Sequence, residues 1–160
     1  MDQREALRIN NVFEQYQITK QSLKYLQHSY EKVKTLQSRL ETATDLTQFS
    51  MEELDDLEAF SARFARCSDI CIQKLFRAID HFELIQNGSI IDRLNRMEKN
   101  GIIQSAEVWK NIREDRNEIA HDYVLEDNRS FYLQLIQNTP AILAIEAKIE
   151  NWLALKNLRS

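Results

Sequence analysis

Apolar side chains recur with a seven-residue repeat along the first quarter of the chain. Only Thr19 and Gln37 break the repeat, whose members are Ile9, Val12, Tyr16, Leu23, Leu26, Tyr30, Val33 and Leu40. A sustained heptad places such residues on one helix face and is typical of helices that pack side by side at a shallow angle. The pattern predicts a helix over residues 4–40. It packs along a neighbouring helix of the same bundle, with a coiled coil as the alternative.

A second long helix is predicted over residues 51–85, after a connection rich in Thr and Asp at 41–50. Ser50 and Glu53 have the spacing of a capping box, which marks its start. Its apolar positions are Leu54, Leu57, Phe64, Cys71, Leu75, Ala78, Phe82 and Ile85. Asp69 lies among apolar neighbours in the middle of this helix. It either pairs with Arg116 or Arg63, or it points to solvent.

Turn and capping residues divide the second half of the chain. Ser89 is expected to cap a short helix over 90–99, which ends at Asn100 and Gly101. Ser105 is expected to cap a helix that reaches about residue 123, followed by a charged loop at 125–129.

A last helical region begins near Ser130. The pair Thr139–Pro140 reads as an N-cap followed by Pro in the first turn, so the final helix is expected over 141–155. It buries Ile142, Ile145, Ile149 and Trp152. The chain is therefore predicted to be a single all-α domain over residues 1–160. We expect an up-and-down bundle of about five helices, with two long antiparallel helices and shorter ones beside them.

Composition supports this fold class and limits the function. The 160 residues include two Gly and one Pro, too few for the turns of a β-sandwich or barrel. The formal net charge of −4 gives no general attraction to nucleic acid, so an RNA contact would need a local basic patch. There is no apolar run of membrane-spanning length and no signal peptide at the N-terminus. We expect a cytoplasmic protein that contacts no membrane.

Two cysteines, Cys67 and Cys71, are four residues apart on the second long helix. Half of a metal site is one interpretation, but no His or Cys close in sequence completes it, and His81 is ten residues away. We favour two small buried residues on one helix face, and we expect no metal and no cofactor.

The predicted helix that follows Ser105 has a charge in its apolar face. Trp109, Ile112, Ile119 and Tyr123 form a heptad-like seam, and Arg116 occupies the position where an aliphatic residue would pack. A buried guanidinium is costly unless it is paired. Five residues later comes His121, one of three histidines in the chain.

Arg116 and His121 have the side chains needed for metal-free cleavage of RNA. Imidazole exchanges a proton near neutral pH, and guanidinium stabilises charge on a phosphorane. Five helical residues give a rise of about 7.5 Å and a rotation of roughly 140° beyond one turn, so the two do not stack on one face. Asn117 shares the face of His121 and could orient it. Two copies across a two-fold axis would supply two of each residue, which makes a homodimer part of the hypothesis. The competing interpretation is a His favoured by the helix dipole and an Arg whose stem packs on the core.

The segment from Arg116 to Tyr123, Arg-Asn-Glu-Ile-Ala-His-Asp-Tyr, resembles the signature of the HEPN superfamily. The Tyr two residues after the His makes the segment similar to the signature of the HepT-like branch in particular. The resemblance implies a homodimeric, metal-independent ribonuclease toxin encoded beside a nucleotidyltransferase antitoxin. It also implies that Arg116 and His121 are catalytic and that Asn117 supports them. Tyr123 would be the residue that the partner modifies with adenylyl groups, which would block the cleft by charge and bulk.

Two other functions stay open from the sequence. The same fold serves as a non-catalytic substrate-binding or regulatory partner of a nucleotidyltransferase, and fold alone does not separate these roles. The presence of both Arg116 and His121 favours catalysis, whereas the acidic balance favours the interaction module. A purely structural helical adaptor is supported only by the heptads of the first helix.

Overall fold

The computed structural model describes residues 1–121 and 129–159, and within them it contains helices and no strands. The prediction of an all-α fold is confirmed. In chain order the elements are α1 (Gln3–Lys34), α2 (Gln37–Thr42), the 3-10 turn η1 (Leu46–Gln48), α3 (Met51–Asp69), the π-helical segment η2 (Ile70–Leu75), α4 (Phe76–Phe82), α5 (Ile90–Lys99), α6 (Ala106–His121), α7 (Arg129–Leu143) and α8 (Ile145–Leu155).

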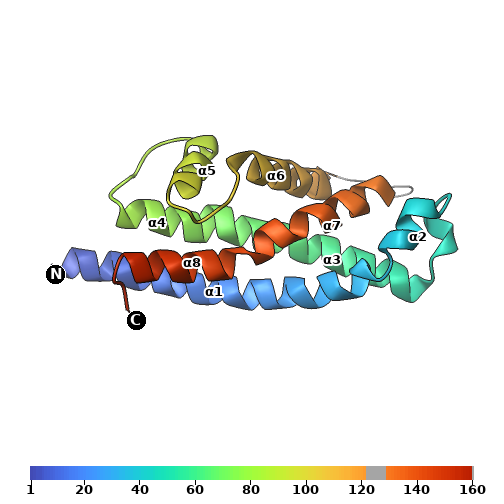
Figure 1. The fold of residues 1–160 in the computed structure, drawn as a ribbon, viewed down its shortest axis with the longest axis horizontal. Helices are drawn as coiled ribbons and strands as arrows, with labels where there is room; N and C mark the ends of the chain where they lie inside the picture. Colours follow the sequence, from blue (N-terminus) through green and yellow to red (C-terminus); the bar gives the residue numbers. More distant parts are fainter. Residues whose placement is uncertain (122–128, 160) are drawn as a thin grey trace.

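The bundle is elongated and is built on two long antiparallel rods (Figure 1). One rod is α1, and the other is the continuous helix formed by α3, η2 and α4, which packs along it. The helices α5 and α6 cover the second rod, and α7 and α8 run back along the bundle so that both termini lie at the same end. Among the described residues, no helix has both the length and the apolar character needed to span a membrane.

The heptad of the first helix faces the core as predicted. Seven of its eight members are buried and Tyr30 is partly buried. Thr19, which breaks the repeat, is also fully buried, and its hydroxyl donates to the Gln15 carbonyl at 2.8 Å. This intrahelical bond satisfies the buried hydroxyl without a partner from another helix.

The first helix is shorter than predicted. It ends at Lys34 rather than at residue 40, and α2 begins at Gln37 after a tight turn. The Thr35 hydroxyl donates to the Lys32 carbonyl at 2.6 Å. The Thr35 and Leu36 amides donate to carbonyls three residues back instead of four. A Thr side chain that competes for backbone groups explains the break.

The second long helix starts at the predicted residue, and its backbone changes from α-helical to π-helical winding at Ile70. The Glu53 amide donates to Ser50 Oγ at 3.1 Å, and the Ser50 amide donates to Glu53 Oε1 at 3.0 Å, which completes the capping box. The helix ends at Phe82 instead of residue 85, because Leu84 takes a positive φ of 65°. The π-helical segment η2 in its middle was not predicted.

The helix α5 has the predicted ends, with a second capping box between Ser89 and Asp92 and with Gly101 at φ 72°. Ser105 Oγ accepts from the Val108 amide at 3.2 Å at the start of α6, as expected for a cap. The predicted loop at 125–128 lies outside the described residues, and Arg129, assigned to that loop, is already in α7.

The interpretation of Thr139–Pro140 as a helix start is wrong. The helix α7 continues through Pro140 to Leu143, and α8 begins at Ile145. Thr139 is buried and its hydroxyl donates to the Leu135 carbonyl at 2.7 Å, so it does not cap the following amides. Pro140 removes one amide donor, but its own carbonyl accepts from the Ala144 amide at 3.0 Å.

Candidate functional site

The helix α6 lies antiparallel to the rod formed by α3, η2 and α4. Near its start the Trp109 ring packs edge-on against Phe76, with centroids 5.2 Å apart. Further along, Arg116 contacts Asp69, which comes earlier in the chain than Phe76. Trp109 and Ile112 are buried and Ile119 is partly buried, so the apolar seam of this helix is confirmed as far as the description extends.

Arg116 is paired with Asp69, the first of the two partners considered for that carboxylate. Arg116 Nε donates to Asp69 Oδ1 at 2.7 Å, and this hydrogen bond raises the pKa of the guanidinium. Arg63, the other candidate partner, instead donates to Ser29 Oγ at 2.8 Å. The side chains of Arg116 and Asp69 are 34% and 41% exposed, so the pair lies at the surface and is accessible to a ligand.

The Asp69–Arg116 pair forms part of the wall of a pocket between the long rod and α6. The pocket has a volume of about 380 Å³. Its polar lining consists of Ser68, Asp69, Gln73 and Lys74 from the rod, together with Arg113, Arg116 and Asn117 from α6. Pockets of this size bind small ligands or segments of larger ones. The structure therefore brings together Arg116, Asn117 and Asp69, three of the predicted site residues.

The π-helical segment η2 forms the floor of this pocket through Ile70, Ile72, Gln73 and Lys74. Wider winding weakens the regular backbone hydrogen bonding, and π-helical turns occur frequently at functional sites. One carbonyl of the segment is satisfied from outside the rod, because Arg93 Nη1 of α5 donates to the Ile72 carbonyl at 3.1 Å. The winding of the pocket floor is thus coupled to the docking of α5.

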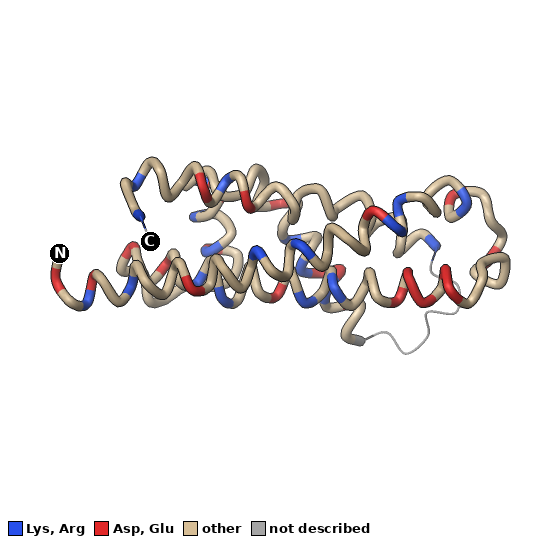
Figure 2. Tube along the Cα trace, turned by 90° about the horizontal axis from the view of Figure 1, so that it is seen from below, with Lys and Arg blue, Asp and Glu red and all other residues tan. Residues whose placement is uncertain are grey.

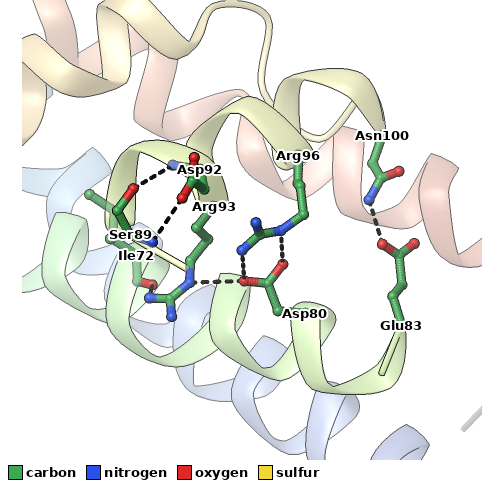
Figure 3. Close-up of polar contacts among 8 residues, drawn as sticks. All are labelled: Ile72, Asp80, Glu83, Ser89, Asp92, Arg93, Arg96 and Asn100. Atoms are coloured by element: carbon green, nitrogen blue, oxygen red, sulfur yellow. Dashed lines mark hydrogen bonds and ion pairs between the residues drawn. The ribbon is translucent and has the colours of Figure 1, made fainter. Parts of the chain in front are cut away.

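The contact between α5 and the rod centres on Asp80, which is 2% exposed (Figure 3). Its Oδ2 accepts from Arg93 Nε at 3.1 Å and from Arg96 Nη2 at 2.7 Å, and its Oδ1 accepts from Arg96 Nε at 2.8 Å. The hydrogen bonds to Asp80 raise the pKa of Arg96. One buried carboxylate therefore positions both arginines, one of which reaches the pocket floor.

Asp115, next to Arg116 on α6, is a buried charge that the sequence analysis did not single out. It is 1% exposed, whereas Arg116 is only partly buried, so Asp115 is the charge that the seam of α6 actually buries. The side-chain amides of Gln134 and Asn138 on α7 both donate to it. Burial raises the pKa of Asp115 despite these two donors. Its spacing from Ile112 and Ile119 fits the same seam and was the available signal.

Two predicted site residues cannot be placed in the same way. His121 is the last residue of α6, and its side chain lies outside the description. Tyr123 lies outside the described residues altogether. By helical register position 121 is one turn beyond Asn117, which lines the pocket.

Charges are unevenly distributed over the molecule. Acidic residues are concentrated in the first turns of α3, at 52–58, whereas Lys and Arg gather midway along the bundle (Figure 2). Around the pocket, the cations Lys74, Arg113 and Arg116 accompany one carboxylate, Asp69. The surroundings of the pocket are therefore locally basic, although the chain has a net charge of −4.

The two cysteines take no part in this site. Cys67 and Cys71 are free thiols, both fully buried in the core, as the packing interpretation predicted. Within the part of the chain that the structure describes, no three His, Cys, Asp or Glu side chains are grouped so that they could hold a metal ion.

Two comparisons, with protein-family models and with curated proteins, find no match for this chain.

Proposed function

We propose that the protein is a metal-independent endoribonuclease that acts as the toxin of a toxin–antitoxin pair. The observation that carries the proposal is the anchoring of Arg116 by Asp69 in a basic pocket, five residues before His121 on the same helix. The resemblance of this segment to the HEPN signature supports the same assignment.

The proposed reaction uses the ribose 2′-hydroxyl of the RNA as the nucleophile. His121 takes the proton of that hydroxyl, whose oxygen attacks the adjacent phosphorus, or gives a proton to the departing 5′-oxygen. Arg116 stabilises the charge that builds on the phosphorane oxygens. The P–O5′ bond breaks, leaving a 2′,3′-cyclic phosphate and a 5′-hydroxyl end, and no metal or cofactor is required.

A homodimer supplies the second acid–base group that one copy lacks. Because Arg116 and His121 are separated by about 140° around the helix, one copy presents them from different sides. Two copies of α6 across a two-fold axis provide two imidazoles, so that one acts as base while the other acts as acid. Asn117, which shares the register of His121, is the proposed supporting residue.

The proposed regulator is a nucleotidyltransferase antitoxin that meets the toxin in the cytoplasm. Transfer of adenylyl groups to Tyr123 adds negative charge and bulk two residues beyond His121. Such a modification repels the phosphates of RNA and silences the cleft. Purified toxin mixed with the nucleotidyltransferase of a neighbouring reading frame and ATP should gain mass in steps of one adenylyl group, and Tyr123→Phe should not.

The deciding experiment compares RNA cleavage and growth arrest by the wild-type chain and by His121→Ala. The purified chain, incubated with total RNA and excess chelator, should yield fragments with 2′,3′-cyclic phosphate ends, and its expression should stop growth. His121→Ala should lose both effects with an unchanged circular dichroism spectrum. His28→Ala changes an exposed histidine on α1 and is the matched control. A folded wild-type chain that cleaves no RNA would overturn the proposal and favour a non-catalytic partner of a nucleotidyltransferase.

A further inference from the structure

The pocket carries more positive charge than its one carboxylate, Asp69, neutralises. Arg113 is partly buried on α6 and Lys74 is exposed on η2, and both line the pocket. Neither side chain forms an ion pair with any described residue, whereas Arg116 uses Nε to hold Asp69. Two cations that converge on one concave site without a carboxylate partner provide a binding site for an anion.

The position of Arg113 separates it from the proposed reacting phosphate. Arg113, Asn117 and His121 follow one another at intervals of four residues, so they lie in one row along α6. Arg113 is eight residues from His121, a rise of about 12 Å along the axis, whereas Arg116 is about 7.5 Å away. Measured along the axis, a phosphate next to His121 is closer to Arg116 than to Arg113, and Arg113 is placed to meet a different phosphate of the same strand.

We propose that Arg113 and Lys74 form a second phosphate-binding subsite, which holds an RNA strand by a phosphate distant from the one that is cleaved. The inference rests on the proposed function and adds a requirement to it. The substrate must be a single strand long enough to place phosphates at both positions. Arg113 and Lys74 are binding residues that contact the backbone and carry no part of the chemistry. The partly buried Arg113 supplies a forked donor and the exposed Lys74 supplies a point charge from the opposite wall.

Binding to an inactive background tests the subsite directly. Full-length His121→Ala is titrated with a fluorescein-labelled ten-nucleotide RNA of mixed sequence and with a labelled dinucleotide, at several salt concentrations in chelator. Adding Lys74→Ala and Arg113→Ala should weaken binding of the longer RNA at least tenfold. It should also reduce the slope of log affinity against log salt by about 0.7, the value for one phosphate of a single strand that is no longer neutralised. Binding of the dinucleotide, which has one phosphate, should change less than twofold.

A charge-matched control separates this subsite from a general electrostatic effect. Lys20→Ala with Lys24→Ala removes two lysines of α1 that line a different surface hollow, and should leave RNA binding unchanged. Equal losses in the two double variants, or no loss in Lys74→Ala with Arg113→Ala, would overturn the inference.

The same variants distinguish failure of the subsite from failure of the ribonuclease proposal. In an otherwise wild-type chain, Lys74→Ala with Arg113→Ala should raise KM for long RNA at least tenfold with little change in kcat. Cleavage with an unchanged KM would overturn the subsite and leave the ribonuclease in place. A chain that cleaves nothing, but whose RNA binding depends on Lys74 and Arg113, would overturn the ribonuclease and leave the subsite.

Discussion

Arg116 and Asp69 are 47 positions apart in the sequence, and the Nε of the arginine lies 2.7 Å from the Oδ1 of the aspartate. A guanidinium has five N–H donors, and only the one at Nε is committed in this contact. The terminal amino groups have no acceptor among the described residues and stay available to a phosphate. Asp69 thus fixes the direction of Arg116 without occupying the donors that suit a substrate.

Removal of the Asp69 carboxylate should therefore separate activity from stability. Asp69→Asn should lower RNA cleavage by about 10- to 100-fold, because a misplaced guanidinium loses transition-state contacts. The free energy of unfolding should fall by less than about 1 kcal/mol, since pairs exposed to this degree contribute little. Single-turnover cleavage and urea unfolding measure the two effects.

The control for this prediction is an ion pair elsewhere on the rod. Asp56 accepts from Lys32 Nζ at 3.2 Å on the surface between α1 and α3. Asp56→Asn should have a similarly small effect on stability and none on cleavage. A loss of activity as large as that of Asp69→Asn would mean that Asp69 acts only through the general charge of the surface.

The contact of Asp80 with Arg93 and Arg96 should matter far more for folding. Asp80→Asn removes the carboxylate that holds two guanidinium groups, whose side chains are 15% and 24% exposed. Breaking a buried ion pair from one side typically costs about 3–5 kcal/mol, and the partial exposure of the arginines places the expected loss near the lower end, about 3 kcal/mol. Chemical denaturation of the purified variant measures it.

Glu83, also drawn in Figure 3, is the matched comparison for Asp80. The Glu83 carboxylate accepts from the side-chain amide of Asn100 at 3.0 Å and from Lys156 Nζ at 3.3 Å. The lysine side chain is 44% exposed, so water can solvate its charge when the pair is broken. Glu83→Gln should therefore destabilise the protein by only about 1 kcal/mol. Equal losses of unfolding free energy in Asp80→Asn and Glu83→Gln would show that the burial of Asp80 between two arginines adds nothing to stability.

The sequence predicted those features of the fold that depend on local pattern. The heptad of the first helix, the capping box at Ser50 and the left-handed glycine at 101 each follow from residues a few positions apart, and each is observed. The pairing of Asp69 with Arg116 was one of three alternatives, beside a pairing with Arg63 and a solvent-exposed carboxylate. It could not be chosen from sequence, because the choice depends on which face of the rod α6 covers.

Features that depend on distant packing were not predicted. The π-helical winding of η2 changes the register without an unusual composition, and it is supported by Arg93, which donates to the Ile72 carbonyl from 21 positions away. The sequence pattern predicts Arg116 as the charge in the apolar seam, although Asp115 and Arg116 both lie in the interval between Ile112 and Ile119. Asp115 is the one that is buried, and the side-chain amide nitrogens of Gln134 and Asn138 on α7 donate to its carboxylate there.

Asp115 predicts a specific dependence of stability on pH. Burial raises its pKa in the folded protein above the value of about 3.9 expected in the unfolded chain, so the folded state favours the protonated form. The resulting stabilisation is fully present below about pH 3.9 and is lost as the pH rises through the folded-state pKa. Asp115→Asn cannot ionise, so its free energy of unfolding should increase relative to wild type as the pH is raised from about 4 to about 7.

The difference in unfolding free energy between Asp115→Asn and wild type separates the effect of Asp115 from that of carboxylates whose pKa is shifted in the opposite direction. Asp45, Glu53 and Asp92 have lowered pKa values because each accepts hydrogen bonds at a turn or helix start, and their contributions cancel when the variant is compared with wild type. The amide that Asp115→Asn introduces replaces one acceptor by a donor, which adds a loss that does not vary with pH. Only the slope is therefore diagnostic. Urea unfolding at each pH measures it, with Asp55→Asn as the control for loss of an exposed carboxylate, and a difference that stays constant or falls with pH would contradict the burial of an ionisable Asp115.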